Sequence, residues 1–128
     1  MQDQLIQYLT HLVQINSVNP DLSAAGQGER NIAEYIHSHF QLLKIPSDIH
    51  TVIDDRCNTT AVLTGRDKNR ILLLNGHIDT VGVDGMDDPF TLKKAGDRLY
   101  GRGTYDMLAG CAIQMGLAYY FSQHPCPI

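Results

Sequence analysis

Two stripes of apolar residues at helical spacing occupy the first third of the chain. In the first, a leucine recurs every three or four positions, which predicts an amphipathic helix over residues 3–15 that ends before the Asn19–Pro20 turn. The second follows Gly28 and is stopped by Pro46. The residues of the two stripes are Leu5, Leu9 and Leu12, and then Ile32, Ile36, Phe40 and Leu43. The chain therefore begins with two helices, each with one apolar face.

The middle of the chain has the composition of β-strands. Residues 48–53 and 58–64 are rich in Ile, Val and Thr and are separated by a polar turn, which predicts two strands. Residues 71–74 (ILLL) are apolar on both faces, as in a central strand covered by helices on each side. Residues 90–100 contain a Gly-Asp turn between two short extended pieces, which predicts a hairpin.

The last predicted helix, residues 107–121, has almost no polar face. A helix that is apolar all round has to be buried, but only seven residues follow Phe121. Covering it would take further strands or helices. The pattern therefore predicts an α/β fold, an incomplete α/β/α sandwich in which helices flank a partial sheet.

Composition narrows the class of protein. The 128 residues, 43% hydrophobic and 19% charged, fit a single globular domain. A formal net charge of -4 with scattered Lys and Arg argues against a nucleic-acid partner. The start lacks the pattern of a signal peptide, and no apolar run approaches the roughly 20 residues of a membrane span. We therefore expect a cytoplasmic protein with no membrane partner.

The cysteines do not form a recognisable site. Cys57, Cys111 and Cys126 are odd in number and widely spaced, which fits neither a disulfide framework nor a thiolate zinc site, and we interpret them as small buried side chains. A cysteine hydrolase that uses Cys111 is disfavoured because this residue lies within an apolar helix.

Candidate chemistry begins where the predicted central strand ends. His77 and Asp79 are two residues apart, so in an extended segment they project to the same side and Asp79 can orient the imidazole toward a metal. Asp106 follows Gly101 and Gly103, which permit a tight turn or a close backbone approach. From the residues alone, a metal site and a structural histidine both remain open.

The charge around this segment favours cations. Between Ile71 and Leu92 there are four aspartates and neither Lys nor Arg, which predicts a negative field at the end of the strand. The aspartates are Asp79, Asp84, Asp87 and Asp88.

Two segments resemble the signatures of a known family. NGHIDTV at 75–81 and LYGRGTYDMLAG at 99–110 resemble those of the zinc-dependent aminoacylases, acetylornithine and succinyl-diaminopimelate deacylases, carboxypeptidase G and related dipeptidases. LVQINSVNP, with the later Gly28 and Glu29, resembles the family's opening helix and loop. The resemblance extends over essentially the whole chain and aligns it with the first third of a full enzyme.

The resemblance implies roles for three residues. His77 would bind one metal ion, Asp79 would be the catalytic-site carboxylate that orients it, and Asp106 would bridge two metal ions. The implied cofactor is zinc, two ions per complete site, with cobalt or manganese as alternatives. The implied reaction is hydrolysis of the amide bond of a small N-acyl amino acid or peptide.

The chain departs from the family pattern after Asp106. Leu108, Ala109 and Gly110 stand where the family usually has a lysine and two glycines, and residues 107–128 contain no Asp or Glu. The family's Glu-Glu pair, a general base followed by a metal ligand, is thus absent. His124 resembles no ligand signature, and we interpret it as an exposed loop residue.

We therefore interpret residues 1–128 as the amino-terminal part of a metallohydrolase catalytic domain, without the rest of that domain or the lid or dimerisation domain. The expectation is weak or no metal retention and no hydrolysis by this chain alone. The alternative is a non-catalytic remnant or interaction fragment, with a homo-oligomer formed through exposed apolar surface.

Overall fold

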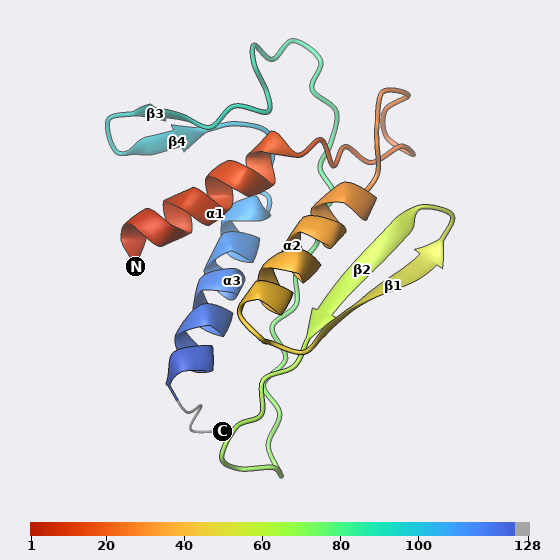
Figure 1. Ribbon diagram of the computed structural model, residues 1–128. Helices are drawn as coiled ribbons and strands as arrows, with labels where there is room; N and C mark the ends of the chain where they lie inside the picture. The colour runs from red at the N-terminus through yellow and green to blue at the C-terminus, as the bar shows by residue number, and fades with distance from the viewer. Residues whose placement is uncertain (125–128) are drawn as a thin grey trace.

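The structure, a computed structural model, describes residues 1–124 and shows a mixed α/β arrangement (Figure 1). Over these residues there are three helices and two separate two-stranded antiparallel sheets. The elements are α1 (Gln2–Gln14), α2 (Arg30–Leu42), β1 (Ser47–Ile53), β2 (Arg56–Ala61), β3 (Lys93–Ala95), β4 (Arg98–Tyr100) and α3 (Leu108–Gln123). The α/β class and the three predicted helices are confirmed.

The hydrophobic core lies among the three helices. α1 packs along α3. The two helices come close to each other near Gly116 of α3, where a Cβ atom would collide with the Leu5 side chain. The most deeply buried core side chains are Leu12, Val13, Ile32, Ile45, Leu108 and Met115. The predicted apolar stripes of the first two helices thus face the core.

The two predicted strands and the predicted hairpin are formed. β1 and β2 pair from Ser47 opposite Ala61, and α2 packs against them, with the Thr59 hydroxyl donating to the Ala33 carbonyl at 2.9 Å. β3 and β4 turn at Gly96, whose φ of +61° is the left-handed conformation that glycine adopts readily. These elements follow from local sequence alone.

The predicted central strand over residues 71–74 is not formed. These residues belong to no strand and their side chains are exposed, from 47% at Leu74 to 93% at Ile71. A strand needs a partner for its backbone hydrogen bonds, and within residues 1–124 no segment pairs with this one. The sole parallel bridge nearby in the described part joins Val18 to Thr80.

As the sequence indicated, the described residues do not cover the last helix on all sides. The face of α3 with Leu108, Cys111 and Met115 is buried against the core, whereas Ile113 and Leu117 are 51% and 37% exposed. A single layer of helices covers α3 on one side only. No helix among residues 1–124 is both long and apolar enough to cross a bilayer.

The prediction that the cysteines are small buried side chains is confirmed for the two that the structure describes. Cys57 and Cys111 are buried free thiols, and Cys126 lies outside the described residues. Burial raises the pKa of the Cys111 thiol to about 11. A thiol with that pKa is not a nucleophile near neutral pH, which argues against the cysteine hydrolase.

Candidate metal centre

The structure brings His77, Asp79 and Asp106 into direct contact. His77 Nδ1 lies 3.0 Å from Asp79 Oδ1, and His77 Nε2 lies 2.9 Å from Asp106 Oδ1. The imidazole is thus placed between two carboxylates, one at each nitrogen. The side chain of Asp79 is 26% exposed and that of Asp106 is 78% exposed, so the Asp106 side of the ring faces solvent.

The segment with His77 is fixed by contacts to the first turns of α3. The Cys111 thiol donates to the His77 carbonyl at 3.3 Å, and the Gln114 amide donates to the Asn75 carbonyl at 3.0 Å. At Gly76 a Cβ atom would lie 2.9 Å from the Met107 Cε, so the backbone of this segment passes close to the Met107 side chain. These contacts replace the sheet hydrogen bonds that were expected for a central strand.

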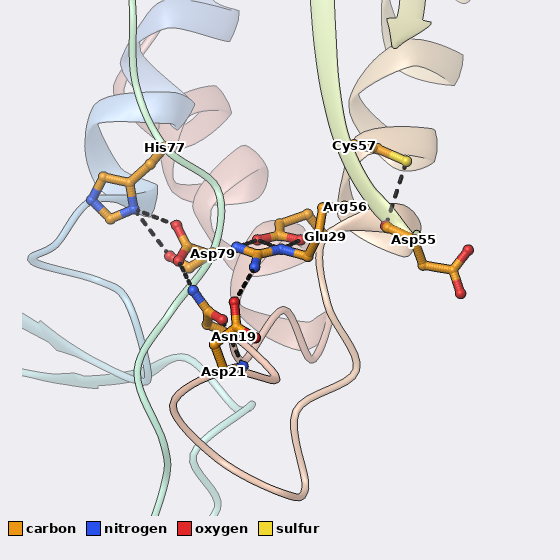
Figure 2. A network of polar contacts seen from close by, with 8 residues as sticks. All are labelled: Asn19, Asp21, Glu29, Asp55, Arg56, Cys57, His77 and Asp79. Carbon is orange, nitrogen blue, oxygen red and sulfur yellow. Dashed lines mark hydrogen bonds and ion pairs between the residues drawn. The ribbon is translucent and has the colours of Figure 1, made fainter. Parts of the chain in front are cut away.

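Asp79 is held from the loop that follows α1. The Asn19 side-chain amide donates to Asp79 Oδ2 at 2.9 Å, while Asp79 Oδ1 faces His77 (Figure 2). The neighbouring backbone is paired with the same loop, since Thr80 N–H donates to Ser17 O at 3.0 Å and Asn19 N–H donates to Thr80 O at 2.8 Å. Sequence reasoning missed Asn19 because 60 residues separate the partners.

Asp106 reaches the site through a sharp turn before α3. Gly103 has a φ of +77°, and a Cβ atom there would lie 2.7 Å from Thr80 Cγ2 and 2.8 Å from Leu108 Cδ1. At Gly101 a Cβ atom would lie 2.8 Å from Val13 Cγ1. The tight turn and close approach predicted for the two glycines are therefore present. The Asp106–Met107 peptide bond is cis.

The pKa of His77 is raised above its ordinary value of 6.5. Partial burial lowers the pKa, but hydrogen bonds to Asp106 and to Asp79, which stabilise the imidazolium, outweigh it. A cleft of about 230 Å³ opens beside these residues and is also lined by Thr80 and Arg102. The Thr80 hydroxyl and Arg102 Nε are buried and have no hydrogen-bond partner among residues 1–124, and sequence reasoning proposed no role for either side chain.

The other aspartates of the predicted negative field do not join the site. Asp88 pairs with Lys93 at 3.1 Å, and Lys93 also donates to the Asp87 carbonyl. Across the described residues, no group of three or more His, Cys, Asp or Glu side chains is arranged to hold a metal ion. Lys93 directly follows residues 71–92, which contain no Lys or Arg. Its ion pair with Asp88 therefore neutralises part of the negative charge predicted for this segment.

The donor atoms at His77 and Asp106 suit a divalent cation as two of its ligands. One imidazole nitrogen and one carboxylate oxygen are ligand types that zinc accepts, and neighbouring donors in its coordination shell lie roughly 3 Å apart. The 2.9 Å between His77 Nε2 and Asp106 Oδ1 is close to that separation. A catalytic zinc usually has three protein ligands, and the site as described offers two.

Comparison with known proteins relates the chain to one family of peptidases. Peptidase family M20/M25/M40 matches residues 73–125, a range that contains both His77 and Asp106. The chain is 32% identical over 113 residues to a probable succinyl-diaminopimelate desuccinylase of Staphylococcus aureus, covering 85% of this chain and 26% of that protein. Residues 73–125 of this chain thus carry the pattern of peptidase family M20/M25/M40. Peptidases of the M20 family are generally metal-dependent.

Other relatives match a similar share of the chain. N-formyl-4-amino-5-aminomethyl-2-methylpyrimidine deformylase of Halalkalibacterium halodurans is 31% identical over 123 residues, covering 89% of this chain and 29% of that protein. The uncharacterized protein YqjN of Bacillus subtilis is 30% identical over 149 residues, covering 91% and 26%. The chain spans about a quarter of the length of the curated relatives it matches.

His124 behaves as the sequence predicted. It is exposed at the end of α3, where its ring stacks on Tyr120 with centroids 4.3 Å apart and its Nδ1 lies 2.9 Å from the Tyr120 carbonyl. It takes no part in the site around His77.

Proposed function

We propose that this chain belongs to a metal-dependent hydrolase of amide bonds, in which His77 and Asp106 are metal ligands and Asp79 orients His77. The observation that supports this most directly is the placement of the His77 ring between the two carboxylates, with Nε2 and Asp106 Oδ1 2.9 Å apart at the mouth of a cleft. The ligand roles are inferred from this geometry together with the family pattern.

Each residue has a separate task in the proposed mechanism. Asp79 accepts a hydrogen bond from the Nδ1–H of His77, which leaves the Nε2 lone pair available as a ligand. Asp106 presents its carboxylate to solvent beside His77 Nε2, where it would be available as a second metal ligand. The cation we propose is zinc, with cobalt or manganese as alternatives, and when bound it would act as a Lewis acid on the amide carbonyl and activate a water molecule.

The proposed substrates are small N-acylated amino acids or peptides. The names of the matched relatives describe removal of a succinyl group and of a formyl group from an amine. Both are hydrolyses of an amide with a small acyl part, and the family resemblance of the two signature segments points to the same bond. The sequence and structure of this chain give no basis for choosing one acyl group.

The ligand roles can be tested by cobalt titration of the 128-residue chain. We expect weak binding because two ligands are fewer than the usual three, and His77→Ala and Asp106→Ala should each weaken it by at least about tenfold. His124→Ala is the matched control, since His124 is exposed and stacks only on Tyr120. Equal cobalt affinity in all four proteins would contradict the proposal.

The expected lack of activity has its own test. After dialysis, metal analysis of the 128-residue chain should find no stoichiometric metal, and N-acyl amino acids should not be hydrolysed, because residues 107–128 offer no carboxylate as general base. Two tightly held zinc ions per chain would show that this expectation is wrong.

One observation favours the alternative of a non-catalytic interaction fragment. Ile71, Leu73 and Ile113 expose large apolar side chains, at 93%, 80% and 51%. Under this alternative, a second copy of the chain covers them, and sedimentation would show an oligomer that depends on protein concentration and is insensitive to added metal. A monomer whose His77 variant loses cobalt binding would favour the hydrolase.

A further inference from the structure

We propose that Asn19 is a positioning residue of the metal centre, which holds the Asp79 carboxylate so that the proton of the His77 ring stays on Nδ1. This inference rests on the proposed function, because it assumes that His77 Nε2 is a metal ligand. Asn19 Nδ2 donates to Asp79 Oδ2 at 2.9 Å, and Asp79 Oδ1 lies 3.0 Å from His77 Nδ1 (Figure 2). The three side chains form one chain of hydrogen bonds.

The orientation of the Asn19 amide is fixed by its second hydrogen bond. Asn19 Oδ1 accepts the backbone N–H of Asp21 at 2.9 Å, so the oxygen is engaged within the loop and the NH₂ group has to point at Asp79. The Asn19 backbone is held as well, since its N–H donates to Thr80 O at 2.8 Å and its carbonyl accepts from the N–H of Leu22 and of Ser23. Asn19 is thus a rigid donor.

The loop that contains Asn19 is tied to the helical layer by an ion pair. Asp21 Oδ2 lies 2.8 Å from Arg56 Nη1 at the start of β2, and Arg56 also binds the buried carboxylate of Glu29 just before α2. Figure 2 shows Arg56 lying between Glu29 and Asp21, with Asn19 beyond. Because Glu29 is only 5% exposed, this end of the network is held inside the fold.

The support of Asp79 matters because the His77 ring can donate a hydrogen bond to either of two carboxylates, Asp79 or Asp106. With no metal bound, a neutral imidazole can place its single proton on Nδ1 toward Asp79 or on Nε2 toward Asp106. Asp106 is 78% exposed and free to solvate, whereas Asp79 is 26% exposed and bonded to Asn19. A fixed Asp79 biases the proton to Nδ1, which leaves Nε2 as the ligand.

Asn19→Asp is the variant that isolates this role. It keeps an Oδ1 acceptor for the Asp21 N–H, and so the loop turn, but replaces the donor to Asp79 with a carboxylate that repels it. Asn16→Asp is the matched control: the same change three residues away, at a side chain whose Oδ1 accepts the Val18 N–H and does not touch Asp79.

The first measurement is the ¹⁵N spectrum of the His77 ring in the metal-free chain, at a fixed pH well above the pKa of the ring. We expect the unmodified chain and Asn16→Asp to show the Nδ1–H tautomer, and Asn19→Asp to shift toward Nε2–H. A merely structural role in the loop would leave the tautomer unchanged in Asn19→Asp, and that result would overturn the proposal.

The second measurement is cobalt affinity. Removing the outer partner of a ligating histidine, here Asp79, typically weakens metal binding by roughly 10- to 100-fold. Asn19→Asp displaces that partner without removing it, so it should weaken binding by up to about tenfold, while Asn16→Asp stays within about twofold. Equal affinity for both variants would overturn the role of Asn19. No cobalt binding by the unmodified chain would refute the proposed function instead, and the metal-free tautomer would still decide on Asn19.

A third measurement uses the unmodified chain and covers the case in which Asn19→Asp does not fold. If the Asn19 amide donates to Asp79 as described, one of its two NH₂ protons should resonate downfield and exchange slowly with solvent. The NH₂ protons of Asn31 should not, because Asn31 is exposed and its side chain makes no hydrogen bond among residues 1–124. Two averaged, fast-exchanging protons at Asn19 would overturn the proposal without any variant.

Discussion

The helical layer and the segment with the candidate metal centre are held together in different ways. Leu12, Ile32 and Leu108 of the three helices are at most 1% exposed and share one core. The segment 71–79 is extended and belongs to no strand, and its apolar residues at 71–74 are largely exposed (Figure 1). Packing stabilises the first region, whereas a few individual hydrogen bonds position the second.

This difference explains how so exposed a segment keeps three site residues together. Its fixed points are the Thr80 backbone, the His77 carbonyl and the Asp79 carboxylate, which contact the loop after α1 and the first turns of α3. Loss of one such contact is expected to change the geometry of the site more than the stability of the fold. Loss of core packing is expected to do the reverse.

The largest effect on stability is expected at the centre of the helical layer. Leu12 is 0% exposed, so Leu12→Ala should lower the free energy of unfolding by about 3 kcal/mol through lost burial and the cavity left behind. Leu42→Ala is the control, because Leu42 is 83% exposed in α2 and its truncation should cost under about 0.5 kcal/mol. Urea unfolding measures both, and equal losses would show that the core is not packed as described.

The next effect is expected where the helical layer meets the turn before Asp106. Gly103→Ala places a Cβ atom against Thr80 and Leu108 at a φ of +77° and should cost about 2 kcal/mol or more. Gly96→Ala is matched in backbone conformation, with a φ of +61°, but meets open space and should cost only about 1 kcal/mol. Urea unfolding of the two variants separates the cost of steric contact from the cost of backbone strain. Equal losses of unfolding free energy would show that contact with Thr80 and Leu108 adds nothing to the cost at Gly103.

A smaller effect is expected from pH in the helical layer. Burial lowers the pKa of His39, and nearby His11 lowers it further. The neutral ring is therefore favoured in the folded state. Its contribution to stability is complete above pH 6.5, the ordinary pKa of histidine, and is lost as pH falls through the lowered folded-state pKa. His39→Phe retains an aromatic ring against Tyr8 and should remove this acid-dependent loss.

The measurement is the free energy of unfolding of the unmodified chain and of His39→Phe across this pH range. His77 has a raised pKa, so its contribution is present below the unfolded pKa and lost as pH rises through the folded pKa, the opposite sign. The contribution of His77 is the same in both proteins, so it cancels in the difference between their free energies of unfolding. A difference that does not change between pH 6.5 and acid would contradict the prediction for His39.

The smallest effect is expected in the extended segment. Leu73 is 80% exposed, so Leu73→Ala should change the free energy of unfolding by less than about 0.5 kcal/mol, despite an apolar sequence that predicts a buried strand. Urea unfolding at low protein concentration is the test. A loss like that of Leu12→Ala would mean that Leu73 is covered in solution, for example by a second copy of the chain.

Local sequence predicted much of this fold. The two apolar stripes placed α1 and α2, the Gly-Asp turn placed the β3–β4 hairpin, and the Ile- and Val-rich runs placed β1 and β2. The prediction of a central strand at 71–74 was wrong because apolar composition describes what a residue would bury, whereas a strand also needs a hydrogen-bonding partner, and the described residues offer none.

For the site, sequence by itself determined the three residues whose side chains meet, since His77 and Asp79 are two apart and Asp106 follows a glycine-flanked turn. Tertiary structure alone decided which atom faces which: Asp79 and Asp106 contact opposite nitrogens of His77, and Asn19 reaches Asp79 from 60 residues away. The physical reason is that spacing constrains only neighbours along a segment. A hydrogen bond between distant segments depends on how helices and loops pack.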